Sequence, residues 1–134
     1  SILNYKLQNA KANGIKATIE AKIPEQLNVK SFDIAIIMGN LLDNAIEAVS
    51  KLENDKEITI RINFRKNTLY IHVNNTYNGT VLYKNNKIST SQTDKSHHGI
   101  GLNNIEEVIK KYNGTMEIHH TSNNFIVDIL IYVE

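Results

Sequence analysis

The sequence predicts an α+β fold: a two-layer α/β sandwich in which helices cover one face of a mixed, mostly antiparallel sheet. Several segments alternate apolar and polar residues with the period of two that half-buried strands require. Other segments repeat apolar residues at helical spacing, and each such helix must bury one face. The chain has 134 residues, so we expect residues 1–134 to form one domain with a sizeable core.

The first elements predicted are a helix and a strand. Residues 2–12 have the character of the end of a helix, stopped by Asn13-Gly14, a pair suited to the left-handed turn after a helix. Residues 15–23 alternate isoleucine and alanine with lysine, threonine and glutamate, so we expect a strand with one buried face and one wet face. Pro24 lacks an N–H group for the sheet ladder and ends this strand.

A long amphipathic helix and a hairpin follow. The helix begins near Ser31, which we expect to be its N-cap. Residues 58–64 and 69–73 then alternate on either side of Lys66-Asn67, which predicts two antiparallel strands joined by a tight turn. The apolar stripe of the helix consists of Ile34, Ile37, Met38, Leu41, Ala45, Ala48, Val49 and Leu52.

The C-terminal part predicts one helix and two strands. The helix covers residues 101–112 and stops at Asn113-Gly114, and strands lie around residues 115–120 and 124–133. Residues 74–97 are different, because they are rich in Asn, Ser, Thr and Lys and have few apolar anchors. A polar stretch of this length inside a compact domain is typical of a lid or a binding loop.

Composition narrows the class of protein. The 41% hydrophobic and 22% charged residues are ordinary for a globular protein, and a net charge of +1 gives no general attraction to nucleic acid or membrane. The sequence shows no signal peptide and no apolar run near the roughly 20 residues of a membrane span. The absence of cysteine excludes disulfides and thiol catalysis and agrees with a cytoplasmic location. Because the chain starts at Ser1, we expect a fragment of a longer protein.

Two local patterns point to chemistry. Asn40 and Asn44 lie one helical turn apart, outside the apolar stripe, and supply neutral oxygen ligands that suit hydrated Mg²⁺. Asparagine and the adjacent Gly39 are unfavourable inside a helix, and unfavourable residues tend to mark function. The alternative is that the asparagines are solvated and that Gly39 admits a neighbouring strand. The second pattern, His98-Gly99-Ile100-Gly101-Leu102, opens a helix whose N–H groups suit phosphate.

The order of these motifs resembles the GHKL ATPase superfamily. The similar segments are the helix Gly39 to Ala48, the run Asn75-Thr76-Tyr77-Asn78-Gly79, the polar loop and the run His98 to Ile105. Within it, the chain looks most like the catalytic domain of AgrC-type quorum-sensing sensor histidine kinases. The resemblance implies a Bergerat fold that holds Mg-ATP between helices and sheet, an ATP lid at residues 84–97, and γ-phosphoryl transfer to a histidine.

The resemblance also implies roles for single residues. Asn44 would bind Mg²⁺, and Asn40 would help to place the phosphates or a water on the metal. Asn75 stands where the superfamily usually has an aspartate that accepts a hydrogen bond from the adenine amino group. Tyr77 replaces the first glycine of that motif, and Gly79 matches the second. A neutral amide can accept the same bond without the charge assistance. The residues around the nucleotide phosphates would be His98, Gly99, Ile100, Gly101 and Leu102. Lysines also make the polar loop basic, and we expect Lys95, next to this motif, to neutralise phosphate charge.

Position 40 separates reaction classes within the superfamily. Its hydrolytic members carry a glutamate there that activates water, whereas Asn40 cannot act as a base. Transfer to a histidine needs little base catalysis, because neutral imidazole already carries a nucleophilic lone pair. Asp43 or Glu47 could substitute as a base, which stays an alternative. We interpret His72, His119 and His120 as structural or surface residues, because none lies on a helix.

The resemblance implies partners that this chain lacks. The phosphoacceptor histidine would lie on a dimerisation domain of the same kinase, and residues 1–12 would be the end of a helix leading from that domain. A response regulator would act downstream, and the isolated domain would be a monomer. One alternative is a stand-alone kinase of the anti-sigma-factor type, and another is a pseudo-kinase that uses the fold only for protein interaction.

Overall fold

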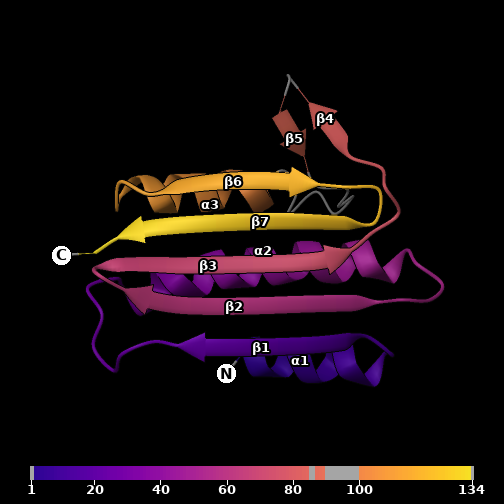
Figure 1. The fold of residues 1–134 in the computed structure, drawn as a ribbon, viewed down its shortest axis with the longest axis horizontal. Coiled ribbons are helices and arrows are strands. Elements are labelled where there is room, and N and C mark those ends of the chain that lie inside the picture. Colours follow the sequence, from indigo (N-terminus) through magenta and orange to yellow (C-terminus); the bar gives the residue numbers. More distant parts are fainter. Residues whose placement is uncertain (1, 85–86, 90–99, 134) are drawn as a thin grey trace.

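In the described part of the chain, a five-stranded sheet is backed by three helices (Figure 1). The computed structural model describes residues 2–84, 87–89 and 100–133. Strands β1 and β2 are parallel, and every other neighbouring pair in this sheet is antiparallel. The sheet order is β1 (Lys16–Lys22), β2 (Glu57–Arg65), β3 (Thr68–Thr76), β7 (Asn124–Tyr132) and β6 (Thr115–His120).

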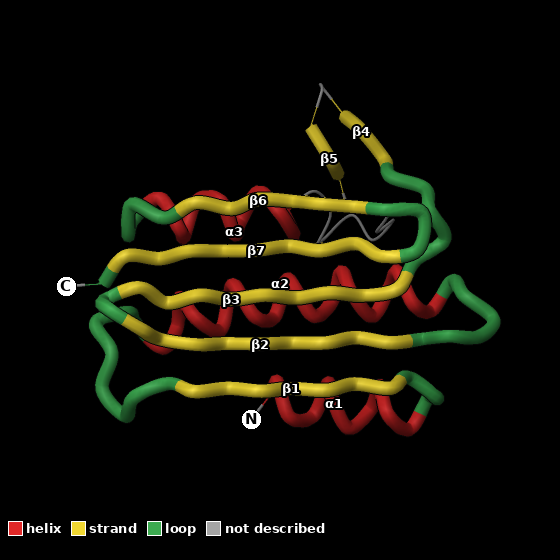
Figure 2. The backbone as a smooth tube through the Cα atoms, in the orientation of Figure 1, coloured by secondary structure: helices red, strands yellow, loops and turns green. Residues whose placement is uncertain are grey.

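The helices α1 (Ile2–Ala12), α2 (Ser31–Ser50) and α3 (Ile100–Lys110) all lie on one side of the sheet, as Figure 2 shows. This arrangement confirms the predicted two-layer α+β sandwich. The core lies between the layers because alternate residues of the central strands face the helices. Its fully buried members include Ile37, Leu41, Leu42, Val49, Ile58, Ile60, Leu69, Ile71, Ile105, Ile129 and Ile131.

The predicted end of the last helix at Asn113-Gly114 is confirmed, and the two residues have different roles. Asn113 adopts the left-handed conformation, with φ of 54°. The Gly114 N–H donates to the Ile109 carbonyl at 2.9 Å, and the Asn113 N–H donates to Lys110 at 3.2 Å, which is a Schellman motif. A Cβ on Gly114 would lie 2.6 Å from the carbonyl oxygen of Leu130 in β7. Glycine is therefore needed here for close approach between α3 and the sheet.

The predicted hairpin is also confirmed. Lys66 and Asn67 have φ values of 51° and 60°, so both central residues of the turn are left-handed. This is the backbone of a type I′ turn, whose twist matches the two strands that it joins. The pairing then extends from Arg65 with Thr68 to Ile58 with Asn75.

The expectation of a buried face on the first strand is wrong for most of β1. Ile19 is 41% exposed and Ile23 is 40% exposed, although Ile15 is buried and Ala17 half-buried. Ile19 pairs with the fully buried Ile60, so it does point to the helix side. It stays exposed because β1 is the edge strand and the helical layer does not cover all of it (Figure 1).

Ser31 is not the N-cap of α2. Lys30 takes that position with extended φ and ψ, and no side chain caps the helix. The N–H groups of Asp33 and Ile34 turn back to the Lys30 carbonyl. The helix start is instead stabilised by Asp33, whose carboxylate in the first turn is favourable near the positive end of the helix dipole.

Residues 74–97 are not one continuous loop. Strand β3 continues to Thr76, because backbone pairing with β7 does not need apolar side chains. Strands β4 (Leu82–Lys84) and β5 (Lys87–Ser89) then form a separate two-stranded sheet. Residues 85–86 and 90–99 lie outside the described part of the chain, so the predicted lid at 84–97 falls largely there. Among the described helices, none is long and apolar enough to cross a membrane.

Candidate functional site

Helix α2 presents Asn40 and Asn44, both half-buried, one turn apart. The Asn40 Nδ2 donates to the carbonyl oxygen of Ile36 at 2.8 Å, and its Oδ1 takes no part in that bond. This back-bond fixes the side chain against its own helix. The Asn40 oxygen therefore stands ready as an acceptor or a metal ligand, on the part of α2 that the apolar core does not use.

The neighbouring glycine has open space around it in the described part of the chain. Among the described residues, a Cβ built on Gly39 would meet no heavy atom within 4 Å beyond its own helix backbone and its two chain neighbours. The interpretation that Gly39 admits a neighbouring strand is therefore wrong for the strands that the structure describes. The glycine leaves open space next to Asn40.

Asp43, one of the two residues considered as a substitute base, is engaged elsewhere. Its Oδ1 accepts a hydrogen bond from Lys6 Nζ at 2.6 Å, and the side chains are 42% and 27% exposed. This ion pair joins α1 to α2. Its carboxylate therefore holds two helices together, which is a structural use for a charge adjacent to Asn44.

Asn75 lies at the end of β3 and is 5% exposed. It follows Val73 on the side of the strand that faces the helices, because buried residues alternate along β3. Its Nδ2 donates to the Thr76 carbonyl oxygen at 2.9 Å. Its Oδ1 accepts no hydrogen bond from any residue in the described part of the chain. An amide oxygen can accept up to two hydrogen bonds, so Asn75 Oδ1 is a candidate for recognising a ligand N–H group.

Tyr77, the departure from the superfamily glycine, anchors the chain just after β3. Its hydroxyl donates to the Thr121 carbonyl oxygen at 2.6 Å, and its ring packs edge-on against Phe125 with centroids 5.7 Å apart. Two residues later Gly79 has φ of 86°, and a Cβ there would lie 3.0 Å from the Ser122 carbonyl oxygen. The glycine at this second position is required by the backbone.

The glycine-rich motif leads into α3. Ile100 is the first residue of the helix and Gly101 the second, so both lie where backbone N–H groups are unpaired and the helix dipole is positive. Leu102 is 7% exposed and belongs to the core, so any part it has in binding phosphate comes from its backbone. The other predicted residues of this region, Lys95, His98 and Gly99, lie outside the described residues.

Sequence reasoning missed a buried charged cluster between α2 and the end of α3. Asp33 is completely buried, and its carboxylate accepts hydrogen bonds from the Tyr112 hydroxyl and from Lys111 Nζ, the latter at 3.1 Å. The Tyr112 oxygen also accepts the Lys30 N–H at 3.2 Å. The Tyr112 hydrogen bond and the Lys111 charge hold the pKa of Asp33 below its usual value, against the opposite effect of burial. Burial, and then the Asp33 bond, raises the pKa of Tyr112.

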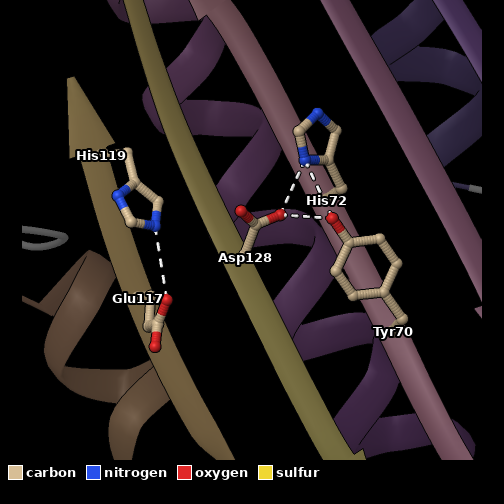
Figure 3. Close-up of polar contacts among 5 residues, drawn as sticks. All are labelled: Tyr70, His72, Glu117, His119 and Asp128. Atoms are coloured by element: carbon tan, nitrogen blue, oxygen red, sulfur yellow. Dashed lines mark hydrogen bonds and ion pairs between the residues drawn. The ribbon is translucent and has the colours of Figure 1, made fainter. Parts of the chain in front are cut away.

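A second polar cluster lies on the open face of the sheet, away from the helices (Figure 3). His72 Nδ1 lies 2.6 Å from Asp128 Oδ1, and the Tyr70 hydroxyl donates to the same oxygen at 2.7 Å. Burial and this bond raise the pKa of Tyr70 to about 12. His119 Nε2 lies 3.3 Å from Glu117 on β6. No group of three or more His, Cys, Asp or Glu within the described residues could hold a metal ion.

Comparison with known proteins gives one family and many similar folds. A sequence model described as GHKL domain matches residues 29–132. No curated protein matches the chain in sequence. Among solved structures, the histidine kinase domain of the Erythrobacter litoralis EL346 blue-light activated histidine kinase has a TM-score of 0.74 at 16% identity, over 98% of this chain and 58% of that one.

Two further structures are similar over nearly the whole chain. The catalytic domain of histidine kinase ThkA has a TM-score of 0.71 at 16% identity, over 97% of this chain and 89% of that one. Acinetobacter baumannii histidine kinase AdeS has a TM-score of 0.65 at 15% identity, over 99% of this chain and 64% of that one. At these identities the likeness is one of fold. The chain spans 58% of the length of the Erythrobacter chain.

Proposed function

Because the chain belongs to the GHKL domain family, we propose that it is the ATP-binding catalytic domain of a two-component sensor histidine kinase, which transfers the γ-phosphate of ATP to a histidine on a separate dimerisation domain. The observation that carries the proposal is the amide of Asn75, which is 5% exposed at the end of β3, with its Nδ2 bonded to the Thr76 carbonyl oxygen and its Oδ1 outside that bond. An adenine amino group can donate to that oxygen. The solved histidine kinase structures with a similar fold support the same proposal.

The asparagines of α2 fit a magnesium ion. Amide oxygens are hard neutral ligands, and Mg²⁺ keeps most of its waters and takes one or two protein ligands. Asn44 is the proposed metal ligand, and Asn40, whose Oδ1 is not used by its bond to Ile36, is proposed to hold the phosphates or a water of the metal. Bound Mg²⁺ would neutralise charge on the phosphates.

The glycine-rich motif completes the proposed site. The N–H groups at the start of α3, including those of Ile100 and Gly101, would donate to the phosphate oxygens, with Gly99 allowing close approach. Lys95, His98 and the lid at 84–97 stay predictions of the sequence. Position 40 favours transfer over hydrolysis, because an amide cannot remove a proton from water. Asp43 is paired with Lys6, which leaves it a poor substitute base.

The finer assignment is also a proposal. We place the domain in an AgrC-type quorum-sensing kinase, in the cytoplasm, with residues 1–12 continuing a helix from the dimerisation domain and a response regulator downstream. The resemblance of the segments Gly39 to Ala48 and His98 to Leu102 supports this subtype.

Nucleotide discrimination tests the role of Asn75. Inosine triphosphate differs from ATP in carrying a carbonyl in place of the adenine amino group, so the wild-type protein should prefer ATP in calorimetric titrations. Asn75→Leu should abolish that preference, whereas Asn75→Asp should strengthen ATP binding by about fivefold through charge assistance. Equal wild-type affinity for the two nucleotides would refute adenine recognition by Asn75.

Metal linkage tests Asn44. Asn44→Ala should weaken ATP binding strongly in Mg²⁺ and little in EDTA, because the proposed role of the Asn44 oxygen in nucleotide binding is exerted through the metal. An equal loss in both conditions would count against the metal role.

Phosphoryl transfer is tested with radiolabelled ATP. The domain alone should hydrolyse ATP very slowly and should not label itself. Adding the dimerisation domain in trans should give an acid-labile, alkali-stable phosphohistidine on that partner, at a low rate because tethering no longer raises the effective concentration. Brisk hydrolysis by the domain alone that is lost in Glu47→Ala would overturn the kinase assignment.

A further inference from the structure

The buried cluster of Asp33, Lys111 and Tyr112 joins the two helices that carry the proposed nucleotide site. Asp33 lies in the first turn of α2, and Tyr112 and Lys111 lie in the turn directly after α3. The start of one helix is thereby tied to the end of the other. The two helices also pack against each other along their lengths and run in opposite directions (Figure 1).

This tie sets which residues of the two helices lie at the same level. Asn44 lies eleven residues after Asp33, and Gly101 lies eleven residues before Tyr112. At about 1.5 Å per helical residue, eleven residues span about 17 Å, so both residues lie at a similar distance from the cluster. Because the helices are antiparallel, the equal spacing brings the proposed metal ligand level with the proposed phosphate-binding helix start.

We infer that Asp33 and Tyr112 are positioning residues that fix the register of α3 against α2, and so the spacing between Asn44 and the glycine-rich start of α3. The inference depends on the proposed nucleotide site. It explains why a charged group is kept in the core: Asp33 is fully buried, and its bonds to Tyr112 and Lys111 tie the first turn of α2 to the turn directly after α3. A phosphate held at the start of α3 can share a metal with Asn44 only in one register.

The cluster holds the helix register from the far end, so its loss should act on the coupling between metal and phosphate. The adenine contact proposed for Asn75 lies on β3 and does not depend on that register. Tyr112→Phe removes the hydroxyl that bonds to both Asp33 and Lys30. We expect nucleotide affinity in EDTA to change little and the enhancement of affinity by Mg²⁺ to fall by about tenfold, since small misplacements of binding groups are costly.

Tyr70→Phe is the matched control. It removes a hydroxyl that likewise donates to an aspartate, Asp128, but on the open face of the sheet. ADP binding is measured by calorimetry in Mg²⁺ and in EDTA for both variants and the wild type, below the unfolding transition of each. A Mg²⁺ enhancement that falls in Tyr112→Phe and is kept in Tyr70→Phe supports the inference. If Mg²⁺ enhances ADP affinity by the same factor in both variants, the inference is overturned.

The outcomes separate this inference from the proposed function. If the wild-type protein shows no ADP binding, or no effect of Mg²⁺, both fail. If the wild type shows the Mg²⁺ effect and Tyr112→Phe leaves that effect unchanged, the proposed function stands and the inference fails. Should Tyr112→Phe not fold, Lys111→Met takes its place, because the Lys111 side chain is 58% exposed and its bond to Asp33 can be removed without opening the core. It should lower the enhancement by a smaller factor, and an unchanged enhancement would overturn the inference.

Discussion

Replacing Gly39 by alanine should stabilise the protein. Glycine inside a helix costs about 1 kcal/mol relative to alanine. An unfolded chain with glycine at this position has more conformational freedom than one with alanine, and folding removes that freedom. Gly39 lies in the interior of α2, and an added Cβ would meet no atom of the described residues within 4 Å beyond that helix's own backbone and its chain neighbours. No clash therefore offsets the gain. We expect the free energy of unfolding to rise by about 1 kcal/mol and the Tm by about 4 °C.

Urea denaturation followed by circular dichroism, without nucleotide, measures this change. Gly114→Ala is the matched control, because its Cβ would lie 2.6 Å from the Leu130 carbonyl oxygen and 3.3 Å from Ile109 Cβ. Both neighbours are fixed in regular structure, so that variant should lose about 1–3 kcal/mol. A loss of stability in Gly39→Ala would refute the reasoning, since it would mean that the methyl group does meet resistance.

Three further variants test the core and the buried polar groups. Ile71→Ala, at a fully buried position of β3, should lower the free energy of unfolding by about 2–5 kcal/mol in the same urea titration. Asp33 has a lowered pKa in the folded state, so its contribution is present above its usual value of 3.8 and is lost as pH falls through the folded pKa. The stability difference between wild type and Asp33→Asn should therefore shrink on going from neutral pH to acid, and a constant difference would contradict this. Tyr70 has its pKa raised from 10.0 to about 12, so its contribution is complete below pH 10 and is lost as pH rises through 12. Alkaline titrations of stability should show a smaller loss in Tyr70→Phe than in wild type.

The sequence predicts most of this fold because its signals are local. The hairpin is predicted by alternation and by Lys66-Asn67, and the helices by the spacing of their apolar residues. The exposure of Ile19 could not be predicted in this way, since alternation shows which side a residue faces and not whether another layer covers it. The sequence pattern did not predict that β3 continues over residues 74–76, because backbone groups make the pairing there and the side chains are polar.

The candidate site was only partly accessible to sequence reasoning. Asn40 and Asn44 are recognisable because they share a helix face and disfavour a helix. The cluster around Asp33 is not, because its partner Tyr112 lies 79 residues away and ordinary surface aspartates occupy the first turns of many helices. Asp33 becomes buried and bonded to Tyr112 and Lys111 only when α2 packs against α3. The unused oxygen of Asn75 likewise becomes visible only in three dimensions.

The parallel placement of β1 has a consequence for the order of folding. Ala17 pairs with Ile58, so β1 joins the sheet only after the intervening helix has closed a long loop, whereas β2 and β3 meet across two residues. Non-local pairings of this kind form late, and peripheral units with little buried surface open first. We therefore expect α1 and β1 to behave as a cooperative unit whose amide hydrogens exchange well before those of β3 and β7, while the rest of the sheet stays folded.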